Sequence, residues 1–465
     1  MQFIENKTFD EIQLGDTADL TRTLKHEDIE LFAVMSGDVN PAHVDEDFAK
    51  SDMFQKVIAH GMWGGALISA VLGTELPGPG TIYLNQNFNF LHPVGLGDTI
   101  TIRVTVTEKS DAHQHVVLDC LCENQDGEPV ITGQAKVIAP SQKIRRPRAT
   151  LPQVHLHESG ARFHELIKAT SPLDPVRTAV VQPCDALSLE GALTAGAKGV
   201  ITPVLIGPKA KIQATAADLG ANIDDLEIID TPHSHAAAET AVAMARAGEV
   251  DMLMKGKLHT DELLKPVVNK ATGLRSERRI SHVFVLDVPN YSKPLLISDA
   301  AINIFPDLQA KRDITQNAID LAQALGIELP KVALLSAVET VTPSIPSTLD
   351  AAGLCKMAER GQITGGALDG PLAFDNAISQ SAAETKGIVS PVAGQADILI
   401  VPDLEAGNMI AKQLVYLAGA EAAGVVLGAR VPIVLTSRAD GIMSRLASAA
   451  ISQLFVHHKS MAKTI

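Results

Sequence analysis

A polar run near the start of the chain holds two side chains that can exchange protons. The stretch SGDVNPAHVDEDF, residues 36–48, places Asp38 and His43 five residues apart, with Asn40 and Pro41 between them. A carboxylate and an imidazole that hold the same water molecule can take a proton from it and deliver one to a carbon atom. A simpler interpretation is also open, because Asn-Pro starts turns and Asp caps helices. The surrounding elements must decide between a turn and a proton-transfer site.

The composition is typical of an α/β globular protein. The 465 residues are 46% hydrophobic and 20% charged, and aromatic residues make up only 3%. The net charge of −15 argues against nucleic acid as the main partner, although local basic groups can still bind a small anion. The first residues lack a hydrophobic signal segment, and the most apolar late stretch is too short to cross a bilayer. We therefore expect a cytoplasmic protein with no nucleic-acid or membrane partner.

The four cysteines suggest a reducing compartment. Cys120, Cys122, Cys184 and Cys355 form no CxxC motif and no obvious disulfide framework. Cys120 and Cys122 lie two residues apart in an alternating run, which favours two buried positions on one strand face over a metal-binding pair. No metal site is predicted.

Charge divides the chain into two units. Residues 1–140 carry 21 acidic and 8 basic side chains, whereas residues 141–150 carry four basic and no acidic ones. A nucleic-acid arm is the less favoured interpretation of this basic segment, since it adjoins an acidic unit. We expect one domain at 1–140, a linker at 141–159 and a second domain at 160–465.

The first unit has the pattern of one helix and a sheet. Residues 60–76 are apolar or small on all sides, which predicts a helix buried all round. Four alternating runs follow, at 81–90, 98–108, 113–122 and 129–138, and predict successive antiparallel strands. A buried helix wrapped by such a sheet is a hot-dog arrangement, which is an α+β fold.

The second unit alternates strands with helices. Short β-branched runs such as 177–183, 200–207 and 251–256 are separated by Ala-rich helical stretches such as 188–197 and 235–249. This alternation predicts parallel sheets covered on both faces, because each crossover places a helix on the sheet. We expect a two-lobed α/β domain with two parallel-rich sheets and a cleft between them.

The stretches SGDVNPAHVDEDFA, AHGMWGGAL and LPGPGTIYLNQNFNFLHPVGLGDTI closely resemble the MaoC-like (R)-specific enoyl-CoA hydratases, over roughly residues 10–140. The resemblance implies addition of water to a trans-2-enoyl-CoA, which gives an (R)-3-hydroxyacyl-CoA. It assigns catalysis to Asp38 and His43. It also assigns the backbone N–H of Gly61 to binding the oxyanion, which the positive end of the helix dipole stabilises further. Asn40 either binds substrate or only shapes the turn, and His60 is more easily explained as structural than as catalytic.

Residues 160–465 resemble the phosphate acetyl/butyryltransferases. The motifs are LMKGKLHTDELLKPVVNK, LISDAAINIFP, GALDGPLAFDNAIS and the long stretch from residue 390 to 440. The family reaction is acyl-CoA plus phosphate giving acyl phosphate plus CoA. The family fold has two α/β lobes, and its last segment returns to complete the first lobe.

The second resemblance also implies site residues. Ser437 and Arg438 match a serine-arginine pair that steadies the CoA sulfur or carbonyl and holds phosphate, for which an arginine fork is well suited. Ser444 stands where acetyl-specific enzymes place an aspartate base, and Tyr416 stands where they have a substrate-binding arginine. Asp440 and Tyr416 instead fit a butyryl-like pattern, and Asp440 is either the base or a helix N-cap.

Other binding residues are expected at strand ends, where loops lead into helix N-termini that favour anions. The loop MKGKLHTDE supplies Lys255, Lys257 and Thr260 for a phosphate pocket, with solvated surface residues as the alternative. The junction VPDLEAGNM supplies Asn408 for substrate binding.

The expected function is therefore bifunctional, with CoA thioesters and inorganic phosphate as substrates and no cofactor. We expect a homo-oligomer. In the main alternative, only the acyltransferase is active and the hot-dog domain binds acyl-CoA or holds subunits together. An oxidoreductase function rests on fold analogy alone.

Overall fold

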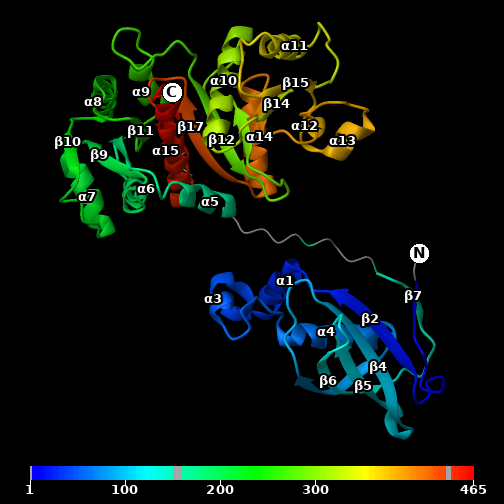
Figure 1. Cartoon of the computed structure of the whole chain (residues 1–465). Coiled ribbons are helices and arrows are strands. Elements are labelled where there is room, and N and C mark those ends of the chain that lie inside the picture. The colour runs from blue at the N-terminus through cyan, green and yellow to red at the C-terminus, as the bar shows by residue number, and fades with distance from the viewer. Residues whose placement is uncertain (1–2, 150–153, 155–159, 436–440, 465) are drawn as a thin grey trace. The chain divides into compact units, whose positions relative to one another are not determined.

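Antiparallel strands dominate the first third of the chain, and strands alternating with helices form the rest (Figure 1). The computed structural model describes residues 3–149, 154, 160–435 and 441–464. The chain divides into two units, Met1–His157 and Glu158–Ile465. Each unit is described by itself.

The first unit is built on a five-stranded antiparallel sheet. Its order is β2-β4-β5-β6-β3. The strands are β2 (Thr17–Thr23), β3 (Ile82–Phe90), β4 (Thr99–Ser110), β5 (His115–Glu123) and β6 (Pro129–Ile138). The four predicted strands are thus confirmed, because their alternating residues place one face on the core. Cys120 and Cys122 lie on that buried face, and burial raises the pKa of their thiols to about 11 and about 12.

One long helix, α4 (Gly61–Thr74), covers the inner face of the sheet. Its side chains Trp63, Ile68, Val71 and Leu72 are buried in a core shared with strands β4, β5 and β6. The prediction of a helix buried all round was wrong. The sheet covers one side only, and the small or apolar residues Met62, Ala66, Ser69, Ala70 and Gly73 are exposed on the other.

Three short helices carry the polar run that precedes α4. They are α1 (His26–Ser36), α2 (Pro41–Val44) and α3 (Glu46–Ser51). At the edge of the unit, β1 (Phe3–Glu5) pairs antiparallel with β7 (Arg145–Pro147). Part of the basic segment within the predicted linker of 141–159 is therefore a strand that pairs with β1 of the first unit.

The second unit contains one continuous sheet of eleven strands. Its order is β10-β9-β8-β11-β18-β17-β12-β13-β16-β14-β15. The strands are β8 (Val176–Val181), β9 (Ile201–Gly207), β10 (Glu227–Asp230), β11 (Met252–Lys255), β12 (Ser281–Asp287), β13 (Leu295–Ser298), β14 (Lys331–Leu335), β15 (Ala367–Leu372), β16 (Ile398–Ile400), β17 (Glu421–Leu427) and β18 (Ile433–Val434).

The expected α/β fold with parallel-rich pairing is confirmed, but the two expected sheets are one continuous sheet. Each lobe has parallel pairs, but β12 and β17 run antiparallel to their neighbours and join the lobes into one mixed sheet. The last strand, β18, pairs with β11, so the chain returns to the first lobe as the resemblance implied.

Helices lie along both lobes (Figure 1). They are α5 (Ala161–Ala169), α6 (Ala186–Ala197), α7 (Lys209–Leu219), α8 (Ser234–Ala247), α9 (Thr260–Val267), α10 (Leu308–Ala324), α11 (Pro346–Glu359), α12 (Phe374–Ile378), α13 (Gln380–Thr385), α14 (Leu404–Ala418) and α15 (Ile442–Thr464). The final helix, α15, contacts α5, α6, α10 and β17, and so links elements of both lobes.

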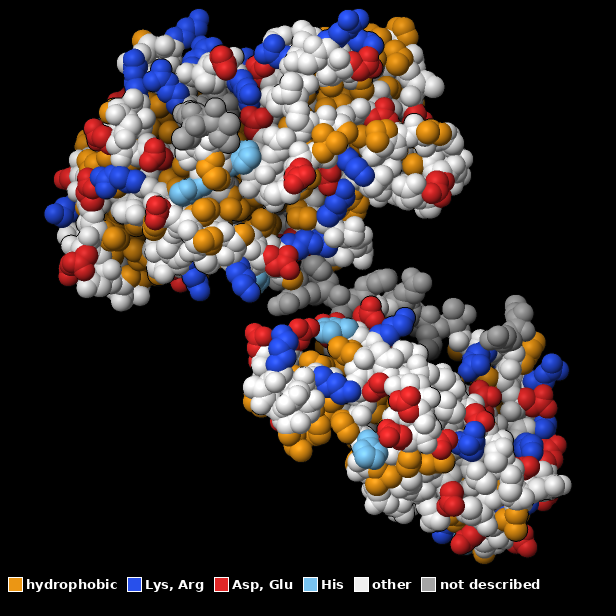
Figure 2. Space-filling model, in the orientation of Figure 1, with side chains coloured by type: hydrophobic (Ala, Val, Ile, Leu, Met, Phe, Trp, Pro, Cys, Tyr) orange, Lys and Arg blue, Asp and Glu red, His pale blue; other side chains and the backbone are white. Residues whose placement is uncertain are grey.

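A buried ion pair ties α5 to this unit. The guanidinium of Arg162 donates to the fully buried carboxylate of Asp287 at 2.6 Å and to the carbonyl oxygen of Tyr291 at 2.6 Å. On the surface, acidic and basic side chains are interspersed over both units on the face that Figure 2 shows. Among the described residues, no helix is both long and apolar enough to cross a membrane.

Candidate active sites

Of the predicted pair in the first unit, Asp38 lies on the turn between α1 and α2, and His43 lies on α2. Helix α1 ends at Ser36 and is capped by Gly37, whose φ of 76° is the left-handed conformation that glycine adopts easily. The side chain of Asp38 then accepts a hydrogen bond from the backbone N–H of Asn40 at 3.2 Å. The helix cap itself is Asn40, whose side-chain oxygen accepts from the N–H of Ala42. Asp38 therefore does not cap a helix, and its exposed carboxylate is not committed to that role.

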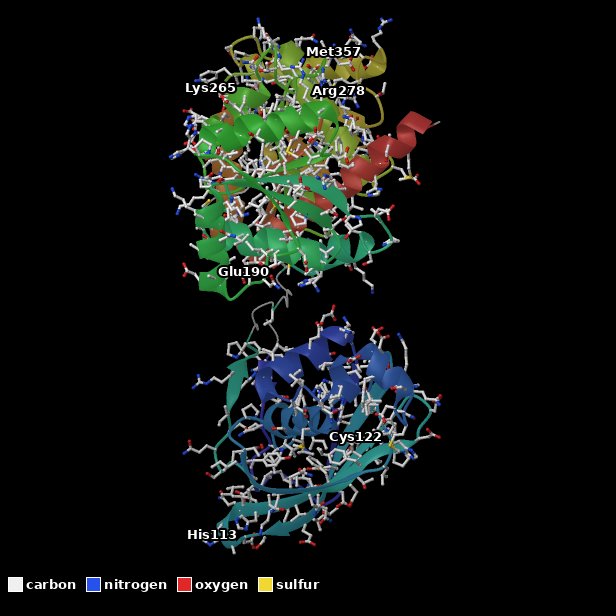
Figure 3. The ribbon with its side chains drawn as sticks, turned by 90° about the vertical axis from the view of Figure 1, so that its left-hand side faces the viewer. His113, Cys122, Glu190, Lys265, Arg278 and Met357 are labelled. Atoms are coloured by element: carbon white, nitrogen blue, oxygen red, sulfur yellow. The ribbon has the colours of Figure 1, made fainter. Side chains whose placement is uncertain are left out.

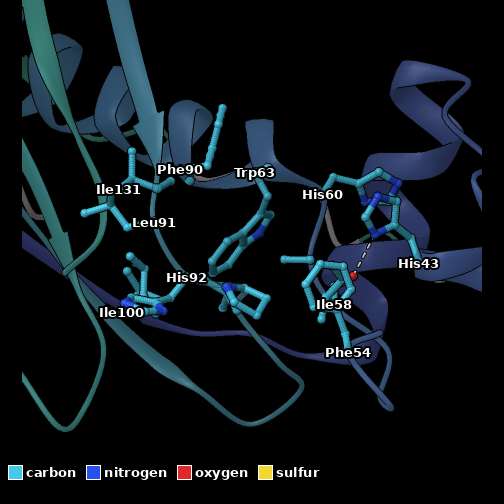
Figure 4. Close-up of a pocket in the computed structure, with 16 residues that line it drawn as sticks. His43, Phe54, Ile58, His60, Trp63, Phe90, Leu91, His92, Ile100 and Ile131 are labelled. Atoms are coloured by element: carbon cyan, nitrogen blue, oxygen red, sulfur yellow. Dashed lines mark hydrogen bonds between the residues drawn. The ribbon is translucent and has the colours of Figure 1, made fainter. Parts of the chain in front are cut away.

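The hydrogen bonds of His43 fix which ring nitrogen is basic. Its Nδ1 lies 2.9 Å from the carbonyl oxygen of Ile58 (Figure 4). A carbonyl oxygen can only accept, so Nδ1 carries the proton. The Nε2 atom is then the unprotonated nitrogen that can take a proton from water.

A second histidine, His60, holds the turn in place. Its side chain is only 3% exposed, and its Nε2 donates to the backbone carbonyl of Asp38 at 3.0 Å. The ring of His60 lies against the ring of His43, with centroids 4.1 Å apart. Its Nδ1 is buried and has no hydrogen-bond partner in the described part of the chain. His60 thus links the Asp38 turn, the ring of His43 and the start of α4.

The two histidines border an apolar pocket of about 270 Å³ (Figure 4). Its lining includes His43, His60 and Gly61 at one end, and Trp63 and Phe90 beyond them. Gly61 is the first residue of α4, so its N–H has no acceptor within the helix. A Cβ at Gly61 would lie 3.1 Å from the ring of Phe90, so glycine avoids a tight contact at this wall of the pocket. The pocket can hold an acyl chain beside a proton-transfer pair and a hydrogen-bond donor.

The same cluster is a poor fit for a metal ion. Asp38, His43 and His60 each bring a ligand atom within 4.8 Å of the others. However, His43 Nδ1 and His60 Nε2 donate to backbone carbonyls, and His60 Nδ1 is buried. A transition metal needs several unprotonated nitrogens at about 2.0–2.1 Å. The arrangement suits proton transfer better.

In the second unit, two of the predicted phosphate ligands lie together. Lys255 ends β11 and is 6% exposed, and Lys257 follows it in the next loop. Both line a cavity of about 410 Å³ together with Arg445, which enters from α15. The sequence interpretation missed Arg445. The only signal in the sequence was a basic residue among the apolar residues of a predicted helix. Such a residue more often lies on the solvated side of its helix.

The remaining predicted residues lie elsewhere or outside the described part of the chain. Thr260 is the exposed first residue of α9 and does not line this cavity. Asn408 donates to the carbonyl oxygen of Ala300 at 3.2 Å from α14, and Tyr416 is 74% exposed farther along that helix. The structure therefore does not bring Thr260 or Tyr416 to the cavity.

Three predicted catalytic residues, Ser437, Arg438 and Asp440, lie outside the described residues. Nearby, Ser444 is buried, and its hydroxyl donates to the backbone carbonyl of Ala422. Ser444 is thus used structurally at the position where acetyl-specific enzymes are expected to have an aspartate.

Comparisons with known proteins match both units. A family model described as phosphate acetyl/butaryl transferase matches residues 234–452, and one described as MaoC like domain matches residues 11–121. A phosphate acetyltransferase from Rhizobium meliloti is 61% identical over 303 residues, which are 65% of this chain and 96% of the relative.

Solved structures match the units separately. A branched-chain phosphotransacylase from Enterococcus faecalis V583 has a TM-score of 0.53 and 30% identity, and the match covers 61% of this chain and 99% of that one. R-hydratase PhaJ1 from Pseudomonas aeruginosa has a TM-score of 0.33 and 40% identity, and its match covers 34% of this chain and 100% of that one. The chain thus belongs to the phosphate acetyl/butyryl transferase family and carries a MaoC-like hot-dog domain ahead of its transferase domain.

Proposed function

We propose that the chain is a bifunctional enzyme of CoA thioesters. The hot-dog domain adds water to a trans-2-enoyl-CoA, and the transferase domain exchanges an acyl group between CoA and inorganic phosphate. The observation that carries the hydratase assignment is the cluster of Asp38 and His43, because His43 also lines an apolar pocket. The family of the second unit supports the transferase assignment.

Hydration proceeds by two proton transfers around one water molecule. The unprotonated Nε2 of His43 and the carboxylate of Asp38 hold the water, and one of them takes a proton as the oxygen bonds to C3. The enolate that forms on the thioester oxygen accepts a hydrogen bond from the N–H of Gly61 at the positive end of α4. A proton then returns to C2, which gives the 3-hydroxyacyl-CoA. In this proposal Asn40 shapes the turn as the cap of α2.

Transfer to phosphate breaks the thioester bond. An oxygen of inorganic phosphate attacks the carbonyl carbon, a C–O bond forms, and the CoA thiolate leaves. The resemblance assigns Ser437 to the leaving sulfur or the carbonyl and Arg438 to the phosphate, and Asp440 is the candidate for the base that removes the phosphate proton. Asn408 and Lys255 are proposed binding residues.

Acetyl-CoA is the proposed acyl substrate, because the 61% identical relative is named a phosphate acetyltransferase. Butyryl-CoA is the competing substrate, since Tyr416 and Asp440 fit the butyryl-like pattern.

A substrate panel tests both activities. Crotonyl-CoA is followed by the loss of its enoyl absorbance, and CoA release from acetyl-, butyryl- and 3-hydroxybutyryl-CoA is followed with and without phosphate. Acyl phosphate is trapped as a hydroxamate. Failure to hydrate crotonyl-CoA would refute the first activity, and failure to trap any acyl phosphate would refute the second.

A second function for the hot-dog domain has its own support. Strand β3 is an edge strand of its sheet and exposes Ile82, Tyr83 and Leu84, and one side of α4 is exposed as well. Pairing with a second copy would cover an edge that is otherwise open to aggregation. A homo-oligomer is therefore proposed. A folded oligomer without hydratase activity would favour a binding or assembly role.

A further inference from the structure

The second unit contains a cavity whose described lining is strongly cationic. It measures about 410 Å³ and lies between the loop after β11, the start of α6 and one side of α15. Lys255, Lys257 and Arg445 contribute positive charge, and Asp185 contributes the one carboxylate among its described lining residues. Figure 3 labels Glu190 on α6, the helix whose first residues form one wall.

The backbone holds the two lysines in place. The N–H of Gly256 donates to the carbonyl of Val181 at 2.9 Å, and the N–H of Lys257 donates to the carbonyl of Gln182 at 2.7 Å. A Cβ at residue 256 would lie 2.5 Å from the oxygen of Val181, so only glycine allows this close approach. The loop is therefore fixed against the end of β8, and its charges are preorganised.

Arg445 reaches the cavity through a groove in α6. Its side chain is 4% exposed, and its Cδ lies 2.8 Å from the position that a Cβ on Gly191 would take. Any larger residue at 191 would displace the guanidinium stem. Lys255 and Arg445 are thus both more than nine-tenths buried at one cavity, where electrostatic attraction to an anion is much stronger than in water.

The start of α6 adds to the positive potential. The helix begins at Ala186, and its first N–H groups carry the positive end of the helix dipole. The carboxylate of Asp185 accepts a hydrogen bond from the N–H of Ser188 at 2.9 Å, which commits it to capping this helix. The one carboxylate among the described lining residues therefore already accepts a hydrogen bond.

We propose that this cavity binds a phosphate group, with Arg445 as a ligand. The phosphate belongs either to inorganic phosphate or to CoA, because both are substrates of the transferase activity on which this inference rests. A guanidinium and two ammonium groups suit the several oxygens of a phosphate, which accept charge-assisted hydrogen bonds.

Isothermal titration of the full-length protein tests the site without using its activity. The two probes are inorganic phosphate and 3′,5′-ADP, the phosphorylated nucleotide portion of CoA. In Lys257→Gln and Arg445→Met we expect the Kd of one probe to rise by about tenfold or more, because each variant loses a charge-assisted bond. A rise for phosphate identifies the inorganic ion, and a rise for 3′,5′-ADP identifies a phosphate of CoA. Lys198→Gln, at the exposed far end of α6, should leave both Kd values within about twofold.

A pair of glycine variants tests the role of the α6 groove without removing a charge. Gly191→Ala should weaken binding of the same probe, whereas Gly196→Ala on the same helix should not, because a Cβ there lies an ordinary 3.5 Å from Pro203. If the folded wild-type protein binds neither probe at millimolar concentration, or if Lys257→Gln and Gly191→Ala bind both as the wild type does, the proposal is wrong. Binding without any acyl transfer would instead refute the proposed transferase and leave the phosphate site standing.

Discussion

Replacing Asp38 with asparagine should remove hydratase chemistry and leave the turn intact. Asparagine keeps an oxygen in the place of the Oδ1 that accepts from the N–H of Asn40 at 3.2 Å. The carboxylate is exposed, so no buried charge partner is left behind. What disappears is the ability to hold and transfer a proton. Loss of one acid-base group lowers turnover by about 10²-fold or more, which corresponds to about 2.7 kcal/mol of barrier.

His43→Asn is the complementary variant. The amide nitrogen of asparagine takes the approximate place of Nδ1 and can still donate to the carbonyl of Ile58. The basic Nε2 is removed, so we again expect a loss of about 10²-fold. Initial rates of crotonyl-CoA hydration give kcat and KM for both variants.

Two controls separate chemistry from folding. Asp45→Asn changes a carboxylate in the same stretch that caps α3 through the N–H groups of Asp47 and Phe48. Asparagine caps helices about as well as aspartate, so hydration should stay within about twofold. Phosphate-dependent CoA release by the same preparation should also be unchanged. Hydration at nearly the wild-type rate in both Asp38→Asn and His43→Asn would show that this pair is not the catalytic centre.

Four further outcomes are expected. His60→Phe removes the donor to the Asp38 carbonyl, so kcat for hydration should fall about five- to tenfold with little change in KM. His60→Gln should recover part of the lost kcat. A lower melting temperature with unchanged kcat would mean that His60 is only structural. Asp287→Ala leaves Arg162 without its buried carboxylate and should destabilise the second unit by about 3 kcal/mol, as measured by urea unfolding. This is the lower end of the range for breaking a buried ion pair, because Arg162 is partly exposed and keeps its carbonyl partners. Burial lowers the pKa of His282 to about 4, below its ordinary value of about 6.5, so the neutral ring contributes stability above pH 6.5 that is lost as pH falls through about 4. The urea midpoints of the wild type and His282→Phe should therefore converge as pH falls from 6.5 to about 4. If the two midpoints change in parallel with pH, the lowered pKa of His282 is contradicted. Separate fragments of residues 1–149 and 158–465 should each fold, the first with hydratase and the second with transferase activity, and two insoluble fragments would refute this modularity.

The local pattern of the sequence was sufficient for much of the first unit. Period-two alternation predicted β3 to β6, because each strand packs one face on the core. The run of small and apolar residues predicted α4 within two residues at each end. The structure brings Asp38 and His43 together, as their spacing predicted. The exposure of one side of α4 could not be predicted, because it depends on which elements cover the helix.

Features that depend on distant parts of the chain were not predictable in this way. The bond between His60 and the carbonyl of Asp38 joins residues 22 positions apart, and nothing in either local pattern reveals it. Arg445 has the appearance of a solvated residue until α6 is placed against it at Gly191. The single sheet depends on strand direction at β12 and β17, and hydrophobicity carries no information about direction.

Strand β18 affects how this protein can fold during its synthesis. The first unit joins elements within residues 3–147, so it can fold while the ribosome is still making the rest. In the second unit, β18 is made after all the other strands of the sheet, yet it occupies an interior place between β11 and β17. Until residues 433–434 emerge, both neighbours present unpaired backbone edges, which are templates for aggregation. The nascent chain should therefore depend most on chaperones before β18 emerges, and slowing translation between β11 and β18 should lower the yield of the transferase domain more than that of the hot-dog domain.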